Sequence, residues 1–145
     1  MYNLYLPYEV SFDSESQTYC CTGLDREEAI FGTGSDATLE LAKERLREAV
    51  LESLLTDASD GNDYTASLYR TLKGDQCLTL TAVELLPIRI RLARAARRLK
   101  QSEVAERMGI SQQAYSKLER SGANPTFSML SRLESALQQE ILQLA

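Results

Sequence analysis

Residues 98–137 read RLKQSEVAERMGISQQAYSKLERSGANPTFSMLSRLESAL. Val104 and Met108 recur at helical spacing, which predicts a short amphipathic helix, and Gly109 suits the left-handed residue of a tight turn. Ser111 has a side chain well suited to capping the start of a second helix. Two short helices joined by three or four residues around a glycine are typical of a helix-turn-helix.

Helical patterns also flank this pair of helices. Apolar residues are spaced for one helix face from Leu92 to Leu99, and residues 121–125 form a polar loop. Thr126 suits the cap of a last helix. We therefore expect an all-α domain whose core-facing residues are Leu92, Ala95, Ala96, Leu99, Val104, Ala105, Met108, Ala114, Tyr115, Leu118, Phe127, Leu130, Leu133, Ala136 and Leu137.

Over about residues 88–138 the chain resembles the lambdoid phage-repressor, or Xre-like, helix-turn-helix family. The matching positions are Gln101 at the start of the second helix, Val104-Ala105, Gly109-Ile110-Ser111 at the turn, Glu119 at the end of the recognition helix, and Asn124-Pro125 before the next helix. The family usually has Ser or Thr where this chain has Lys100, and the weaker cap costs about 1 kcal/mol. The resemblance implies double-stranded operator DNA as the partner.

The resemblance also implies which residues bind DNA. In the family the residue at Gln101 binds a phosphate, and those at Gln112 and Gln113 reach base edges, where a glutamine amide can pair bidentately with adenine. The alternative is that both are ordinary surface glutamines. Ser116 and Lys117 lie on the same exposed side. The candidate DNA-binding residues are Gln101, Ser111, Gln112, Gln113, Ser116 and Lys117.

Three positions are expected to be structural. Arg94 and Glu119 occupy the positions of the family's buried ion pair, which orients the recognition helix without touching DNA. Tyr115 stands where the family has an aliphatic core residue, so we expect it to pack in the core.

Basic residues make the first helix of this domain and its flanks positive. They are Arg89, Arg91, Arg97, Arg98 and Lys100, and those that face phosphates supply sequence-independent affinity. One such domain covers half of a binding site, so we expect a homodimer or higher homo-oligomer on a palindromic operator.

Charge divides the chain into two halves. The whole sequence of 145 residues has a net charge of −5. Residues 1–86 hold 16 acidic and 6 basic residues, a net charge of −10, whereas residues 87–145 hold 5 acidic and 10 basic residues, a net charge of +5. This asymmetry is typical of an acidic module joined to a basic one, and the alternative is a charge dipole that only aids solubility. We predict two domains, 1–86 and 87–145.

The first half has the pattern of a mixed αβ module. Alternating residues predict a hairpin, apolar residues at three- and four-residue spacing predict a long helix, and Pro87 ends the last strand. The helix cap is Ser35 or Asp36. In chain order the predicted elements are a strand at Tyr2–Phe12, a turn at 13–16, strands at Gln17–Thr22 and Ala29–Phe31, a helix at Thr38–Leu55, a loop at Thr56–Tyr64 and a strand at Cys77–Leu86.

This layout resembles the HicB antitoxins of bacterial toxin–antitoxin pairs. The matching features are residues 8–12 with Asp13 in the first hairpin, and Gly34 ahead of residues 38–42. Leu41 departs from the family pattern, and the Pro-Gly dipeptide after the second strand is missing. The resemblance implies an α+β fold, with a partial ribonuclease-H-like domain of three or four strands and one long helix that binds the toxin, followed by the all-α DNA-binding domain.

Enzymatic activity is not expected. The sequence contains no histidine, which excludes Ser-His-Asp and Cys-His triads and histidine-containing zinc sites. A metal-dependent nuclease of the ribonuclease H type needs three or four converging carboxylates. Asp13 and Glu15 fall in a turn, while Glu40, Glu44 and Glu48 suit a solvated helix face, so we expect no catalytic residues, metal or cofactor.

These observations predict the antitoxin of a HicAB-type system. It would neutralise a small basic HicA-like toxin that cleaves mRNA, and it would repress its operon by sequence-specific DNA binding. Catalysis by that family's toxins depends on a histidine, which places this chain on the inhibitory side. The alternative is a stand-alone Xre-family repressor whose N-terminal domain binds a ligand or dimerises.

Further features concern location and assembly. Cys20, Cys21 and Cys77 lack metal or redox spacing, so we expect reduced thiols. The N-terminal residues lack the pattern of a signal peptide and no apolar run approaches membrane-spanning length, so a cytoplasmic protein without a membrane partner is expected. Residues 141–145 could extend the last helix or form a short strand for dimer pairing.

Overall fold

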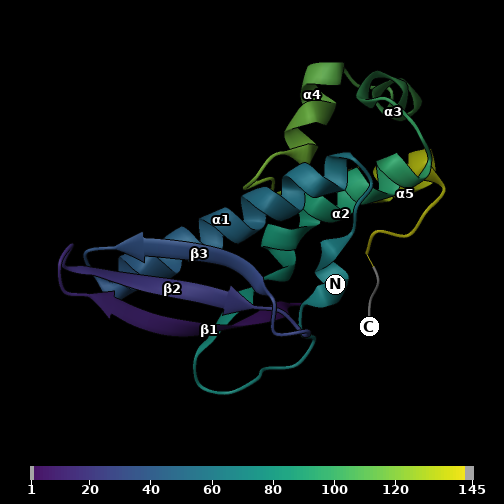
Figure 1. Cartoon of the computed structure of the whole chain (residues 1–145). Helices are drawn as coiled ribbons and strands as arrows, with labels where there is room; N and C mark the ends of the chain where they lie inside the picture. Colours follow the sequence, from purple (N-terminus) through teal and green to yellow (C-terminus); the bar gives the residue numbers. More distant parts are fainter. Residues whose placement is uncertain (1, 143–145) are drawn as a thin grey trace. The chain divides into compact units, whose positions relative to one another are not determined.

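The computed structural model describes residues 2–142, and Figure 1 shows how the chain is folded. A four-stranded sheet with one long helix precedes a series of short helices, so the predicted α+β class is confirmed. The elements are β1 (Leu4–Asp13), β2 (Thr18–Leu24), β3 (Ile30–Asp36), α1 (Leu39–Ser59), the 3-10 helix η1 (Tyr64–Ser67), β4 (Cys77–Leu80), α2 (Ala82–Ala96), α3 (Gln101–Met108), α4 (Gln112–Ser116), the 3-10 helix η2 (Lys117–Glu119) and α5 (Phe127–Leu137).

The chain divides into two compact units. The sheet unit comprises Asn3–Leu54 and Tyr64–Thr81. The helical unit comprises Tyr2, Leu55–Asp63 and the chain from Ala82. The end of α1 therefore belongs to the helical unit, although most of that helix belongs to the sheet unit.

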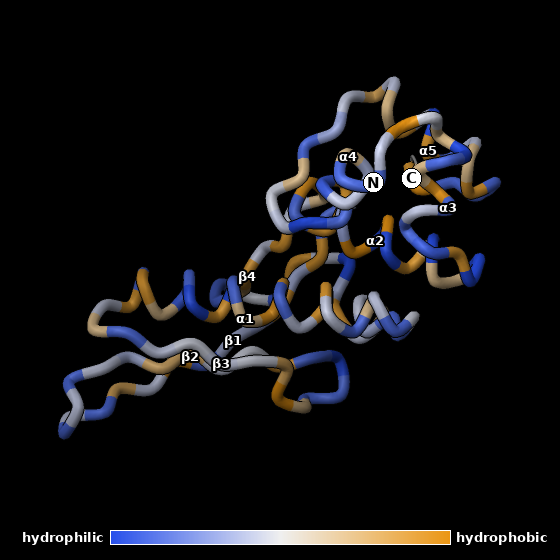
Figure 2. The backbone as a smooth tube through the Cα atoms, turned by 90° about the horizontal axis from the view of Figure 1, so that it is seen from above, coloured by the Kyte–Doolittle hydropathy of each residue, from blue (hydrophilic) through white to orange (hydrophobic). Residues whose placement is uncertain are grey.

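In the sheet unit the four strands are antiparallel and follow the order β3-β2-β1-β4. The alternation predicted for the first strand is visible in the burial of Leu4 and Leu6. Figure 1 shows α1 along one face of β1, β2 and β3, and in Figure 2 its tube alternates between orange and blue segments. The apolar face of α1 thus covers the sheet, with Ala42, Leu46 and Val50 buried.

Gly34 in β3 has no Cβ atom, so the backbone of α1 packs directly against this strand. A Cβ atom at this position would overlap the backbone nitrogen of Leu46 and the carbonyl oxygen of Ala42. The third strand extends to Asp36, beyond the predicted Ala29–Phe31. Gly32 and Gly34 do not end the strand but allow α1 to pack closely against it. The predicted cap was wrong: Thr38 accepts the hydrogen bond from the backbone N–H of Leu41.

The predicted loop at residues 56–64 was partly wrong, because α1 continues to Ser59. Ala58 is completely buried, so this polar stretch carries an apolar residue at the spacing of the helix face. The chain turns only after Ser59, where the backbone N–H groups of Asp60 and Gly61 donate to carbonyls of the last helical turn.

The predicted strand at Cys77–Leu86 was wrong beyond Leu80. The residues Ala82-Val83-Glu84-Leu85-Leu86 open α2, and Pro87 lies inside that helix rather than breaking a strand. Ala, Glu and Leu are strong helix formers. Leu85, Leu86 and Pro87 are buried in succession, which does not fit a strand with one buried face.

The core of the helical unit agrees with the prediction for most of α3 to α5, but not for α2 and the residues directly after it, where the predicted Leu92, Ala95 and Leu99 are only half-buried. Thirteen buried residues form it: Leu86, Ile90, Ala93, Val104, Ala105, Met108, Tyr115, Leu118, Leu130, Leu133, Ala136, Leu137 and Ile141. Three predicted core residues are exposed. Ala96 lies at the end of α2, Ala114 in the first turn of α4, and Phe127, 76% exposed, is the first residue of α5, where the preceding turn offers no packing partner.

The last helix ends at Leu137, because Gln138 adopts a left-handed conformation. One carboxylate oxygen of Glu134 then accepts the backbone N–H groups of Ile141 and Leu142, both at 2.7 Å. These two residues form neither helix nor strand. The prediction for residues 143–145 lies outside the described residues.

Candidate nucleic-acid interface

The turn between α3 and α4 has the predicted geometry. Gly109 has a φ of 66°, and its N–H donates to the carbonyls of Ala105 and Glu106. The hydroxyl oxygen of Ser111 accepts the backbone N–H of Ala114 at 3.1 Å, which caps α4. The recognition segment, as we call α4 together with η2, spans residues 112–119.

Lys100 precedes α3 at the position where a cap is expected. Its side chain has no acceptor, but its backbone N–H donates to a carboxylate oxygen of Glu103 at 2.6 Å. This is one half of a capping box, so the weak cap is partly replaced by a residue three positions later.

The candidate DNA-binding residues of the recognition segment lie on its surface. Gln112, Gln113 and Lys117 are exposed, and Ser116 is half-buried with its hydroxyl donating to the carbonyl of Gln113 at 3.0 Å. Ser111 is exposed and serves as the cap of α4. The two glutamines stand in the first turn of α4, where a side chain can enter a DNA groove ahead of the helix.

Gln101 has an internal partner. It opens α3, is half-buried, and its side-chain amide donates to a carboxylate oxygen of Glu119 at 2.9 Å. Sequence reasoning missed this bond, since nothing local relates two residues that are 18 positions apart. The amide that would meet a phosphate is therefore oriented by the end of the recognition segment.

Three side chains donate four hydrogen bonds to the carboxylate of Glu119. Glu119 is 1% exposed and is the one buried charged residue among residues 2–142. The Arg94 guanidinium binds it bidentately, at 2.6 and 2.9 Å, and the Tyr115 hydroxyl donates to it at 2.6 Å. With Gln101, side chains from α2, α3 and α4 converge on one carboxylate at the end of the recognition segment.

Electrostatics keep this carboxylate charged. Burial opposes its ionisation, but hydrogen bonds from Arg94, Tyr115 and Gln101 outweigh burial and hold the pKa of Glu119 below its ordinary value. Burial, followed by the hydrogen bond to Glu119, raises the pKa of Tyr115. Tyr115 is thus a core residue with a polar function, and its spacing of four residues from Glu119 was the available sequence signal.

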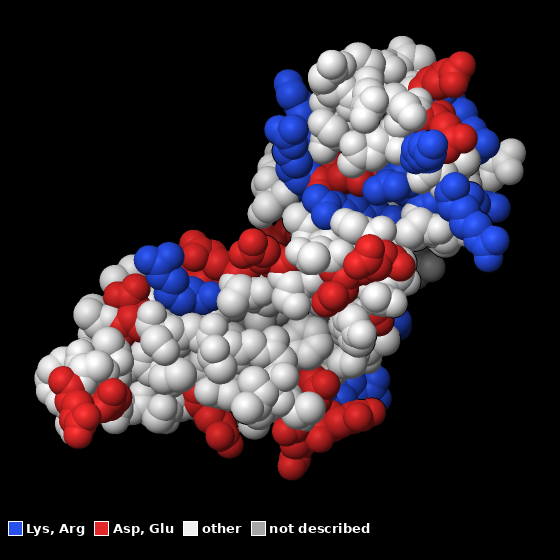
Figure 3. Space-filling view, turned by 45° about the horizontal axis from the view of Figure 1, so that its top comes forward, with Lys and Arg blue, Asp and Glu red and all other residues white. Residues whose placement is uncertain are grey.

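The basic residues fall into two groups. Arg97, Arg98 and Lys100 are exposed, whereas Arg89 and Arg91 are half-buried and have partners inside the helical unit. On the face shown in Figure 3, blue basic side chains gather on the helical unit and red acidic ones are spread over the sheet unit. Among the described residues of the helical unit, the exposed basic residues that sequence reasoning missed are Arg107, Arg120 and Arg132.

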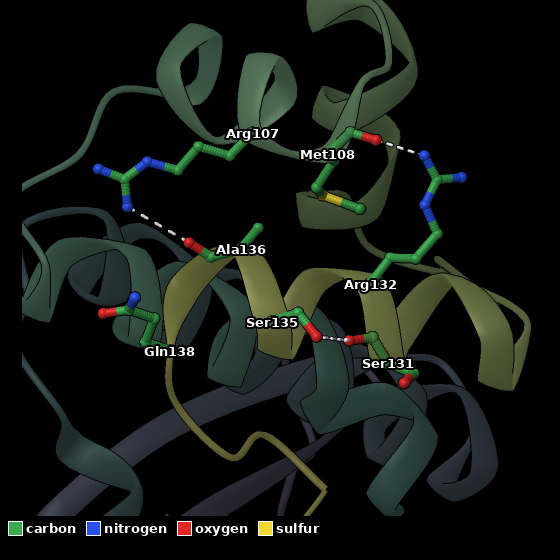
Figure 4. A pocket seen from close by; sticks show the side chains of 7 residues that line it. All are labelled: Arg107, Met108, Ser131, Arg132, Ser135, Ala136 and Gln138. Atoms are coloured by element: carbon green, nitrogen blue, oxygen red, sulfur yellow. Dashed lines mark hydrogen bonds between the residues drawn. The ribbon is translucent and has the colours of Figure 1, made fainter.

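Two of these arginines join α3 to α5 (Figure 4). Arg107 donates to the carbonyl of Ala136 at 3.3 Å, and Arg132 donates to the carbonyl of Met108. Each cation thus meets the C-terminal end of the opposite helix, where carbonyls lack helical partners. The hollow between them has a volume of about 620 Å³ and is also lined by Ser131, Ser135 and Gln138.

Comparison with known protein families decides the class of this domain. Residues 90–144 match the helix-turn-helix family model. The helix-turn-helix match includes Arg94, Glu119 and every candidate DNA-binding residue, and it indicates a DNA-binding transcription regulator. The predicted C-terminal helix-turn-helix is thereby confirmed. A search of curated proteins finds no match to the chain.

Three observations concern other site types. Across residues 2–142, no helix is both long and apolar enough to cross a membrane. In the same range, no group of three or more Cys, Asp and Glu side chains is arranged to hold a metal ion. Cys20, Cys21 and Cys77 are free thiols.

Proposed function

We propose that the chain is the antitoxin of a HicAB-type toxin–antitoxin pair and represses its own operon. Residues 87–145 bind double-stranded operator DNA, and residues 1–86 bind and neutralise a small, basic, HicA-like toxin that cleaves mRNA. A homodimer or higher homo-oligomer places two helix-turn-helix domains on a palindromic operator. The chain acts in the cytoplasm, uses no cofactor and has no catalytic activity.

The observation that carries the DNA-binding part is the exposed pair Gln112 and Gln113 on a recognition segment anchored at Glu119. A glutamine amide offers a donor and an acceptor that match N7 and N6 of adenine in the major groove. Gln101 and Lys117 are expected to meet phosphates, which set the register but carry no sequence information. The bonds to Glu119 hold Gln101 and the end of the recognition segment in one arrangement.

The order of elements supports the antitoxin part. Three antiparallel strands, one long helix and a fourth strand precede the helix-turn-helix, and this is the layout that the HicB resemblance implies. The contact of Gly34 with the backbone of α1 gives a physical reason for a glycine at that position.

Charge also supports it, although less than the sequence halves suggest. The sheet unit holds 12 acidic and 6 basic residues, a net charge of −6, whereas the helical unit holds 9 acidic and 10 basic residues, a net charge of +1. The difference arises because Asp57, Asp60, Asp63 and Glu84 belong to the helical unit. A toxin that binds RNA needs a basic surface, and a module of net charge −6 would attract and cover it.

A base-reading test addresses the DNA-binding part. The duplex that the wild-type chain enriches from a random DNA pool serves as the probe in gel-shift titrations. The Gln112→Ala/Gln113→Ala double variant should lose at least about ten-fold in affinity, because each bidentate contact contributes about 1–3 kcal/mol. Gln76→Ala, in the sheet unit, is the control. Normal binding by the double variant would show that the glutamines do not read bases.

A neutralisation test addresses the antitoxin part. The candidate toxin is the product of an adjacent reading frame that encodes a small basic protein containing a histidine. We expect this product to arrest growth and cleave mRNA when expressed alone, and to do neither when the chain is co-expressed and co-purifies with it. Absence of such a neighbour, or cleavage that persists in the complex, contradicts the antitoxin assignment.

One observation favours the alternative, a stand-alone repressor that binds a ligand. The sheet unit has a polar hollow of about 320 Å³, lined by residues that include Tyr8, Lys43, Arg47 and Cys77. Its volume is at the lower end of the range for small-molecule sites. A small metabolite that changes operator affinity in the absence of any protein partner would favour this alternative.

A further inference from the structure

Arg91 in α2 forms hydrogen bonds with two other helices. Its Nε donates to the backbone carbonyl of Glu119 at 2.9 Å. Its Nη1 donates to the carbonyl of Leu55 at 3.0 Å and to the hydroxyl of Ser59 at 2.6 Å, both near the end of α1. The side chain is 22% exposed, so the guanidinium is mostly removed from solvent.

Arg91 and Arg94 both bind Glu119. They are three residues apart and therefore lie on one face of α2. Arg94 binds the carboxylate bidentately. Arg91 donates to the main-chain carbonyl, which lies at the end of η2 and lacks a helical partner there, and the same Nε lies 4.0 Å from a carboxylate oxygen. The two arginines thus hold both the carboxylate and the backbone of the last residue of the recognition segment.

The Arg91 guanidinium also binds the end of α1. Ser59 donates its hydroxyl to the carbonyl of Leu55 and accepts from Arg91, so these groups form a closed hydrogen-bonded set. A cation at this position also faces the negative end of the α1 dipole. Residues Leu55–Asp63 belong to the helical unit, although they precede the helix-turn-helix match by more than 25 residues.

We propose that Arg91 is a positioning residue for DNA recognition, which ties the end of the recognition segment to the end of α1. The inference rests on the proposed DNA binding. Arg91 donates to internal acceptors, so on this proposal it is not one of the basic residues that face phosphates. The end of α1 is consequently a working part of the DNA-binding unit.

The test compares specific with non-specific DNA binding by the full-length chain. The probes are the duplex that the wild-type chain enriches from a random pool and the unselected pool of the same length, each titrated over a series of salt concentrations. Arg91→Met should lower affinity for the selected duplex about ten-fold, because couplings of this kind contribute factors of roughly 2 to 30. Affinity for the unselected pool should change by less than about two-fold, and the salt slope should not change.

Three variants complete the test. Arg89→Met removes the same charge from α2, but Arg89 binds the carbonyl and ring of Tyr2, so it is the matched control. Arg91→Lys should fall between Arg91→Met and wild type, because one ammonium cannot reproduce the two nitrogen positions. Ser59→Ala should lower specific affinity about two- to three-fold and add nothing to Arg91→Met, as expected for coupled residues.

The outcomes separate this inference from the proposed function. If the wild-type chain enriches no duplex, the proposed DNA reading fails and the inference fails with it. If the wild-type chain enriches a duplex and Arg91→Met binds it within about two-fold of wild type, only the inference fails. Equal losses on both probes, with the salt slope reduced by about one, would make Arg91 a phosphate contact instead. If thermal unfolding shows that Arg91→Met is unfolded, Arg91→Lys and Ser59→Ala decide by the same criteria.

Discussion

The sheet unit and the helical unit are each stabilised internally in a different way. In the sheet unit, Gly34 lets the backbone of α1 pack against β3, and Leu4, Leu6 and Leu46 are buried in the core. In the helical unit, the apolar core surrounds a buried carboxylate, Glu119, with donors from three helices. In the sheet unit, close contact places α1 on the hydrogen-bonded strands, whereas in the helical unit side-chain hydrogen bonds fix the end of the recognition segment.

The difference lies in what fixes the helices in each unit. The strands of the sheet pair through backbone hydrogen bonds, and close packing fixes α1 on them. A recognition segment of eight residues is too short to be stable alone, so its orientation must be imposed by bonds to its neighbours. Fully satisfied polar networks specify a unique arrangement, whereas a partly satisfied one is destabilising.

The largest effect should come from removing the buried carboxylate. We expect Glu119→Ala to lower the free energy of unfolding by about 3–5 kcal/mol, because Arg94 is left as an uncompensated, mostly buried charge. Chemical denaturation followed by circular dichroism measures this. Glu106→Ala, on the exposed surface of α3, is the control and should stay within about 0.5 kcal/mol of wild type. A loss of less than 1 kcal/mol in Glu119→Ala would show that the network is dispensable.

A smaller loss should come from the close contact in the sheet unit. Gly34→Ala places a Cβ atom against the backbone of α1, and we expect destabilisation of about 2–3 kcal/mol, typical of overpacking. The same denaturation experiment measures it. Thr33→Ala, an exposed neighbour in β3, is the control. Wild-type stability of Gly34→Ala would mean that α1 does not lie this close to the strand in solution.

The third prediction concerns pH. The pKa of Glu119 is lower in the folded chain than its ordinary value of 4.5, so its contribution is complete above about pH 4.5 and is lost as pH falls through the folded pKa. Stability measured between about pH 5 and pH 3 should therefore fall more steeply in wild type than in Glu119→Gln, which does not titrate. The pH dependence of Asp13→Asn, which removes an exposed carboxylate of the sheet unit, is measured for comparison. Parallel curves for wild type and Glu119→Gln would contradict the charged assignment.

Most of the helical unit could be predicted from local pattern. The spacing of Val104 and Met108, the turn at Gly109 and the cap at Ser111 are short-range features, and each was found as expected. Arg94 and Glu119 form the ion pair that the family resemblance implies. The exceptions, Ala96, Ala114 and Phe127, lie at or near helix ends, where periodicity does not show whether a packing partner is present.

The sequence by itself determined the α+β class, the alternation of the first strand and the exposed glutamines, because these depend on neighbours within a few residues. The tertiary structure decided the rest. The third strand was predicted to end before Gly34, but Gly34 lies within β3, where α1 packs against it. Residues 82–86 were predicted as a strand, but they begin α2. The bonds from Gln101 to Glu119 and from Arg91 to Leu55 join residues 18 and 36 positions apart. Such partners are chosen by folding in three dimensions, since no local period connects them.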